Sequence, residues 1–214
     1  MITEGVGEDM LDFAELFRRN GRYPEKLLDV GCGLCQEGEQ ILARGIFLTG
    51  IDQDGETIRN VQKRLPQGKF AAADAALWLE NQHQKFDAIL IRRPDVIFRS
   101  KNWRQIFRKL QTALSENGRV TVTTPGVSEA KLCERWLQDM AVTVERSATG
   151  MAEEEFIVTA EDFRQPDRVD GTADNRQTSL IQSLVWEDDQ PHMVCDLRTG
   201  KCTMAAGGEN PESV

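Results

Sequence analysis

The chain has 214 residues, 40% of them hydrophobic, and a formal net charge of −9. It is long enough for one folded domain with an appendage, and its acidity disfavours binding to duplex nucleic acid, whose phosphates would repel it. No apolar run approaches the roughly 20 residues that span a bilayer, so we expect no membrane partner. The acidic N-terminus lacks the apolar segment of a signal peptide, and the number of cysteines, five, is odd. We therefore expect a cytoplasmic protein with free thiols.

Along the chain, the spacing of the apolar residues alternates between helical and strand-like. An opening helix is predicted from apolar residues at helical spacing: Met10, Phe13, Ala14 and Phe17. Five apolar runs then predict buried parallel strands, at 27–30, 46–51, 69–73, 86–91 and 119–124. Helices are expected between them, most clearly at 101–114 and at 128–140, where Ser128 can act as the cap.

The last third of the chain is divided between further strands and polar sequence. Two more strands are predicted at 141–146 and 155–160, whereas residues 163–179 are polar and indicate a linker or surface loop. A short strand at 183–186 and a hairpin within 192–204 follow. We therefore predict an α/β domain over residues 1–162, built on a mostly parallel sheet with helices on both faces, and a small C-terminal extension over 163–214 that forms a lid or hairpin.

A glycine-rich turn follows the first strand. The run LLDV leads directly into GCGLCQEG, and a helix is expected next. Such a turn brings backbone amides, and the N-terminus of a helix, close to a ligand, and Gly31 and Gly33 are the glycines that this approach requires. Taken alone, the pattern is as consistent with an ordinary tight turn.

Two acidic residues strengthen the case for a ligand site. Asp52 ends the second strand, 21 residues after Gly31, and Asp74 follows the third strand. A carboxylate at position 52 can accept both hydroxyl hydrogens of a ribose. Because ligands of open α/β sheets bind at the carboxyl ends of the strands, these residues are expected to point into one crevice. Each aspartate taken alone would be interpreted more readily as a helix N-cap, and it is the ordered set that favours a ligand site.

With these motifs in order, residues 25–160 resemble the class I S-adenosylmethionine (SAM) dependent methyltransferases. The resemblance rests on five segments: LLDVGCG, GIDQD, AAADA, FDAILIRRPD and LSENGRVTVTT. It implies a Rossmann-like sheet of seven strands, with 141–146 and 155–160 as the final hairpin, and SAM as the cofactor. Cys35 departs from the family pattern, which often has a third glycine at this position.

The resemblance also implies which residues hold SAM. The first motif would wrap the methionine part, through Asp29, Gly31, Cys32 and Gly33. Asp52 would hold the ribose and Gln53 would border the adenine. Asp74 would lie near the exocyclic amine of the adenine, the Ala75 amide near its ring, and Ile91, in the fourth strand, would complete the cofactor site.

The end of the fourth strand carries Arg92 and Arg93 before Pro94. Amino-directed members of the family often place Asn or Asp and then two prolines there, so methylation of a base or amide by their mechanism is not expected. A guanidinium at the mouth of the crevice can bind a carboxylate or phosphate. The sequence therefore suggests a small, anionic methyl acceptor, whose identity it does not give. Neither histidine, His83 or His192, is assigned as a catalytic base.

Four other interpretations remain open. Cys32 and Cys35 form the CxxC pattern of thiol-redox proteins, although that function leaves Asp52 and Asp74 unexplained. Zinc binding by Cys32, Cys35, Cys195 and Cys202 is poorly supported by the spacing of the last two, and no metal is expected. A dinucleotide-binding protein would carry glycine at position 36, where this chain has Gln36. Finally, a SAM-binding regulator without catalysis would show the same cofactor motifs.

Overall fold

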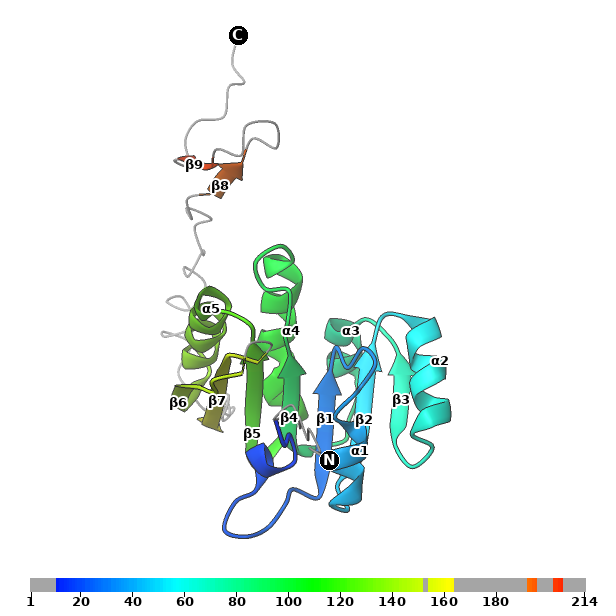
Figure 1. The fold of residues 1–214 in the computed structure, drawn as a ribbon. Helices are drawn as coiled ribbons and strands as arrows, with labels where there is room; N and C mark the ends of the chain where they lie inside the picture. Colours follow the sequence, from blue (N-terminus) through cyan, green and yellow to red (C-terminus); the bar gives the residue numbers. More distant parts are fainter. Residues whose placement is uncertain (1–10, 152–153, 164–191, 196–201, 206–214) are drawn as a thin grey trace, which may run out of the picture. The chain divides into compact units, whose positions relative to one another are not determined.

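The computed structural model describes residues 11–151, 154–163, 192–195 and 202–205 of the chain (Figure 1). The chain divides into two compact units between Pro166 and Asp167. The first unit contains the large sheet and its helices. In the second, the described residues form a two-stranded hairpin.

The core of the first unit is a seven-stranded sheet with the order β3-β2-β1-β4-β5-β7-β6. Its strands are β1 (Lys26–Val30), β2 (Phe47–Asp52), β3 (Lys69–Ala72), β4 (Phe86–Arg92), β5 (Leu114–Thr124), β6 (Ala141–Ala148) and β7 (Phe156–Phe163). The first five strands pair in parallel, and β7 runs antiparallel to both β5 and β6. The predicted Rossmann-like α/β sheet is confirmed, and the strand order reverses direction between β1 and β4, which is where ligands of such sheets bind.

Helices cover both faces of this sheet (Figure 1). They are the 3-10 turn η1 (Glu15–Phe17), α1 (Gly38–Ala43), α2 (Gly55–Arg64), α3 (Ala75–Asn81), α4 (Ser100–Ala113) and α5 (Val127–Gln138). The hydrophobic core consists of two clusters, one on each face of the sheet, because alternate residues of a strand point to opposite faces. Leu27 packs with Phe17, Ile41 and Ile58, from η1, α1 and α2, whereas the next residue, Leu28, belongs to the cluster that holds α3, α4 and α5.

Two local predictions are wrong. Among the described residues, the opening helix is only the single turn η1, held by the Asp12 carboxylate, which accepts hydrogen bonds from the amides of Ala14 and Glu15. Phe13 and Phe17 are nevertheless buried, so their spacing reflects packing on the sheet. The predicted cap Ser128 lies inside α5, which begins after Gly126 without a side-chain cap.

The second unit contains the predicted hairpin. Strand β8 (His192–Cys195) pairs antiparallel with β9 (Cys202–Ala205), and Cys195 lies opposite Cys202 in the register. The strand predicted at 183–186 and nearly all of the polar segment 163–179 lie outside the described residues; Phe163 itself ends β7. In the part of the chain that the structure covers, no helix combines the length and apolarity needed to cross a membrane.

Candidate functional site

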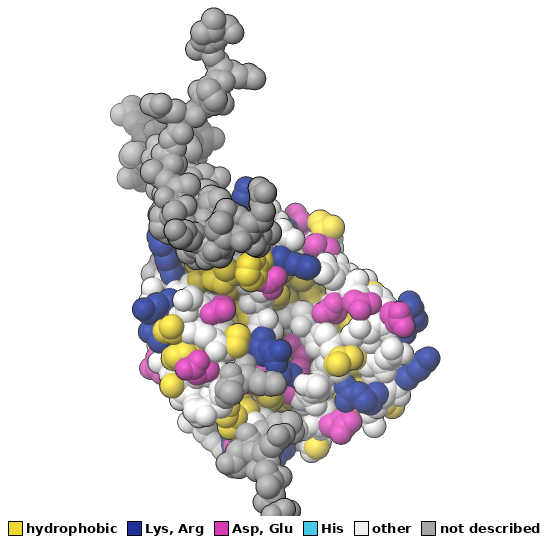
Figure 2. All heavy atoms as spheres, turned by 45° about the horizontal axis from the view of Figure 1, so that its top comes forward, with side chains coloured by type: hydrophobic (Ala, Val, Ile, Leu, Met, Phe, Trp, Pro, Cys, Tyr) yellow, Lys and Arg dark blue, Asp and Glu magenta, His cyan; other side chains and the backbone are white. Residues whose placement is uncertain are grey.

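A cavity of about 220 Å³ opens at the carboxyl edge of the sheet, beside the first three strands. The arrows of β1 and β4 point toward this edge, at the top of Figure 1. The strand ends and the start of α3 contribute Gly31, Ile51, Asp52, Gln53, Ala73, Asp74, Ala75 and Ala76, and α4 with the residue before it contributes Arg99, Asn102, Trp103, Gln105 and Ile106. Figure 2 brings the same edge forward and shows acidic, basic and hydrophobic side chains interspersed on it.

The glycine loop after β1 is fixed by hydrogen bonds to β2. The amides of Gly31 and Cys32 both donate to the carbonyl of Ile51, at 2.8 and 3.1 Å. Gly31 and Gly33 have φ angles of +73° and +50°, in the left-handed region that glycine adopts without steric cost. Glycine at both positions therefore lets the loop make its turn beside the cavity without backbone strain.

Asp52 joins this loop to the end of β2. Its Oδ2 accepts a hydrogen bond from the amide of Gly33 at 3.0 Å, and its Oδ1 accepts one from the amide of Asp54 at 2.9 Å. The side chain is only partly buried and lines the cavity. An ionised carboxylate has about four acceptor positions, so Asp52 holds the loop and still has capacity for the hydroxyl groups of a ligand.

Asp74 combines a structural role with a position in the cavity. It is the N-cap of α3, where its Oδ1 accepts a hydrogen bond from the amide of Leu77 at 2.9 Å. The residue is exposed and lines the cavity beside Ala75. The two interpretations left open by the sequence, helix cap and ligand contact, are therefore compatible in one side chain.

The predicted cofactor residues divide into two groups. Five of them line the cavity: Gly31, Asp52, Gln53, Asp74 and Ala75. Of the other four, Gly33 belongs to the glycine loop, and Asp29, Cys32 and Ile91 are buried and do not contribute to the described lining. Trp103 and Ile106, from the helix predicted at 101–114, line it too.

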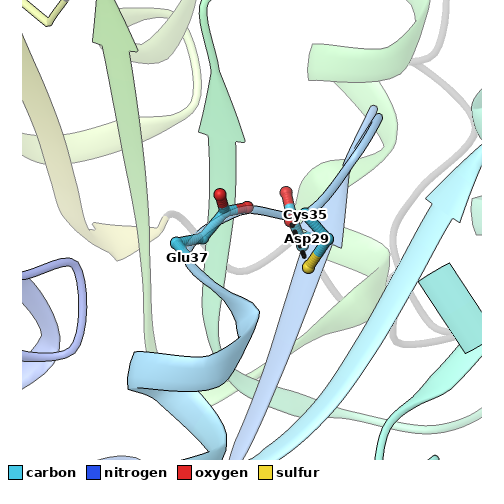
Figure 3. Close-up of side chains that lie close together, drawn as sticks. All are labelled: Asp29, Cys35 and Glu37. Atoms are coloured by element: carbon cyan, nitrogen blue, oxygen red, sulfur yellow. Dashed lines mark hydrogen bonds between the residues drawn. The ribbon is translucent and has the colours of Figure 1, made fainter. Parts of the chain in front are cut away.

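A buried charged cluster lies behind the glycine loop, at the ends of β1 and β4. Figure 3 shows Asp29 on β1, Glu37 at the start of α1 and Cys35 in the loop between them. One potential ligand atom of each residue lies within 4.8 Å of those of the other two. The Cys35 thiol donates to Oδ2 of Asp29 at 3.6 Å. Burial and the neighbouring Glu37 raise the pKa of Asp29 well above its ordinary value, because removing a charge from water favours the neutral acid.

Arg92 is the cation of this cluster. Its Nη2 lies 2.8 Å from Oε1 of Glu154, and its Nη1 donates to Glu37. The guanidinium also lies over the ring of Phe13, 4.4 Å from the ring centre. Arg92 was predicted to bind the acceptor, but its charge is already neutralised by two buried carboxylates of the protein itself, so that role loses its basis.

Arg93 differs from its neighbour in exposure and backbone. The residue is exposed, and its φ angle of +45° is unusual for a residue other than glycine. Its amide donates to the carbonyl of Thr123 at 2.8 Å, which holds the turn against the end of β5. A strained backbone of this kind often marks a functional position.

Cys32 and Cys35 do not have the surroundings of a redox pair. Both are buried, and burial, together with the charge of Asp29, raises the pKa of each thiol well above its ordinary value. Thiol-disulfide exchange requires an accessible thiolate with a lowered pKa. Cys35 has a φ angle of +46°, the conformation that a glycine would adopt without strain. Of the zinc set considered from the sequence, Cys32 and Cys35 belong to the first unit and Cys195 and Cys202 to the hairpin of the second.

Residues 27–118 match the model of a protein family described as "Methyltransferase domain". A curated relative, trans-aconitate 2-methyltransferase of Rhizobium meliloti (strain 1021), is 31% identical over 102 residues, which are 45% of this chain and 37% of the relative. The match therefore spans little more than a third of that enzyme.

Solved structures show the same fold at low sequence identity. The PH0226 protein of Pyrococcus horikoshii OT3 aligns with a TM-score of 0.58 and 15% identity, over 70% of this chain and 86% of its own. The N-methyltransferase NodS of Bradyrhizobium japonicum WM9, in complex with S-adenosyl-L-homocysteine, aligns with a TM-score of 0.54 and 19% identity, over 67% and 79% of the two chains.

Proposed function

We propose that this chain is a class I SAM-dependent methyltransferase, an enzyme that binds SAM and transfers a methyl group to a small molecule. The observation that carries the proposal is the cavity at the carboxyl edge, which collects Gly31, Asp52 and Asp74 from three successive strands. The matched family segment contains all three residues.

The residues around the cavity fit this cofactor. Two carboxylates, at positions 52 and 74, lie at neighbouring strand ends and offer acceptors for hydroxyl and amino hydrogens. The fixed loop at Gly31 and Gly33 allows a ligand to approach the backbone closely. Asp29, Cys32 and Ile91 would support the loop and the adjoining strand from the core side.

In the reaction, the protein chiefly supplies position. SAM, when bound, supplies a methyl group activated by a positively charged sulfur. Asp52 and the glycine loop would fix the cofactor, and the end of β4 would align the acceptor, so that proximity and orientation lower the barrier. A carboxylate acceptor is already ionised at neutral pH, so the protein would need no general base for it.

We assign the acceptor to the class of small carboxylates. The curated relative is named for trans-aconitate, which is a carboxylate. Arg93 is exposed at the end of β4, and an arginine is well suited to bind a carboxylate through two parallel hydrogen bonds. Arg92 is excluded from this assignment, because its side chain is only 17% exposed and is held between the buried carboxylates of Glu37 and Glu154.

Calorimetric titration with SAM, S-adenosylhomocysteine and NADH tests the cofactor. We expect heat with the first two ligands only. Asp52→Asn should weaken their binding by about tenfold, which corresponds to roughly 1.4 kcal/mol of binding free energy, since a neutral amide accepts weaker hydrogen bonds than a carboxylate. Asp54→Asn is the matched control, because Asp54 caps α2 and is not among the residues that line the cavity. No heat with either adenosyl ligand, or binding of NADH instead, would contradict the proposal.

Methyl transfer to a panel of carboxylates, with trans-aconitate among them, tests the acceptor. For an acceptor that is methylated, Arg93→Ala should raise KM at least tenfold, whereas Arg135→Ala, an exposed arginine in the last turn of α5, should not. An equal KM for both variants would remove Arg93 from the site.

A further inference from the structure

Trp103 connects α4 to the glycine loop. The side chain is half-buried and packs against the core cluster of α3, α4 and α5. A Cβ atom placed on Gly31 would lie 3.1 Å from Cη2 and 3.6 Å from Cζ2 of the indole. The six-membered ring of Trp103 therefore lies against the bare backbone of Gly31, and the glycine leaves the room that the ring occupies.

The same indole lines the cavity, on the side formed by α4. With Ile106, one helical turn later, it gives this side an apolar patch beside the polar Arg99, Asn102 and Gln105. On the strand side, Asp52, Gln53 and Asp74 offer polar groups to a ligand. A ligand that fits such walls has hydrogen-bond donors on one edge and a flat, apolar face. A nucleoside has both features, whereas the amino-acid end of SAM has donors on its ammonium group but no flat, apolar face.

We propose that Trp103 is a cofactor-positioning residue, whose indole ring forms the wall on which the nucleoside part of the cofactor packs. This inference rests on the proposed function, because it assumes that the cavity holds an adenosine group. Contacts on two sides, from the core cluster and from Gly31, keep the ring in place before a ligand binds. The packing surface is therefore pre-formed, and binding requires little reorganisation of this wall.

The test measures the Kd of three probes: S-adenosylhomocysteine, adenosine and methionine. Trp103→Ala should weaken the binding of S-adenosylhomocysteine and adenosine by about tenfold and should not change the binding of methionine. Base stacking on an aromatic residue contributes roughly 5- to 150-fold in affinity, so a tenfold loss lies within this range. Trp103→Phe should retain most of the affinity, because it keeps an aromatic face. Trp136→Phe is the control, since Trp136 is buried against Phe107 in the core.

Each outcome has a distinct meaning once thermal melting shows that the variants fold. Equal affinity of the wild type and Trp103→Ala for S-adenosylhomocysteine overturns the assignment of Trp103 but leaves the proposed function intact. Binding of adenosine that depends on Trp103, without binding of SAM or S-adenosylhomocysteine, supports Trp103 and contradicts the proposed function. A wild type that binds none of the adenosyl probes contradicts both.

Discussion

The guanidinium of Arg92 lies 2.8 Å from the carboxylate of Glu154, although 62 positions separate the two residues in the chain. This ion pair, together with that between Arg92 and Glu37, joins the end of β4 to the start of α1 and to the connection between β6 and β7. Both carboxyl groups are buried, so their charges depend on Arg92 for compensation.

Replacing Arg92 should therefore destabilise the fold strongly. Arg92→Met leaves two buried carboxylates without their cation, which should cost about 3–5 kcal/mol of unfolding free energy. Urea denaturation measures the loss. Arg146→Met is the control, because its pair with Glu134 is more exposed and should contribute less than about 1 kcal/mol. Similar losses in the two variants would mean that the buried pairs contribute no more than a surface pair.

Asp29 should make stability depend on pH. Since burial and Glu37 raise the pKa of Asp29 above its ordinary value of 3.8, the folded protein binds more protons than the unfolded chain above that pH. Stability should then fall as the pH rises toward the folded-state pKa, by at most about 1.4 kcal/mol per pH unit. Asp29→Asn should remove this slope. Denaturation at several pH values tests it, with the exposed Asp95→Asn as control; an unchanged slope in Asp29→Asn would exclude Asp29 as the source.

The two loop glycines should differ in their tolerance of alanine. Both have positive φ angles, so either substitution should cost about 1–2 kcal/mol of backbone strain. Gly31→Ala should cost more, because its new methyl group meets Trp103, whereas nothing lies within 4 Å of a Cβ on Gly33. Thermal or urea denaturation gives both losses. In the Trp103→Ala background, Gly31→Ala should lose no more stability than Gly33→Ala. If Gly31→Ala still loses more stability in that background, Trp103 is not the obstacle.

Cys32 and Cys35 should be unreactive in the folded protein. Their burial and raised pKa leave little accessible thiolate near neutral pH. We expect iodoacetamide to label their peptides only after unfolding, as measured by mass spectrometry, and the native protein not to reduce insulin. Reduction of insulin that is lost in Cys32→Ser would restore the thiol-redox interpretation.

Much of the fold is predictable because buried parallel strands leave a strong sequence signal. The apolar runs at β1, β2 and β4 lie within one residue of their observed bounds, and the glycine turn and acidic strand ends indicated which edge binds a ligand. Local helical signals were weaker. Phe13 and Phe17 have helical spacing, but they contact the sheet from an irregular segment and a single 3-10 turn.

The charged cluster could not be predicted, because its members are distant in the chain. Glu37 and Glu154 lie 55 and 62 positions from Arg92, and nothing in the neighbourhood of either glutamate indicates a buried partner. For the same reason, the sequence could not distinguish Arg92 from Arg93. Trp103 was missed because a helix stripe that faces the core and one that faces a cavity have the same periodicity.

The hydrogen bond from the Gly33 amide to Asp52 also has a kinetic consequence. Since the turn is held by the protein's own carboxylate, the loop does not need to search for its bound shape when a ligand arrives. Encounter and capture should then occur in one step, with an association rate set by diffusion and orientation, and differences in affinity between ligands should arise mainly from how slowly each one leaves.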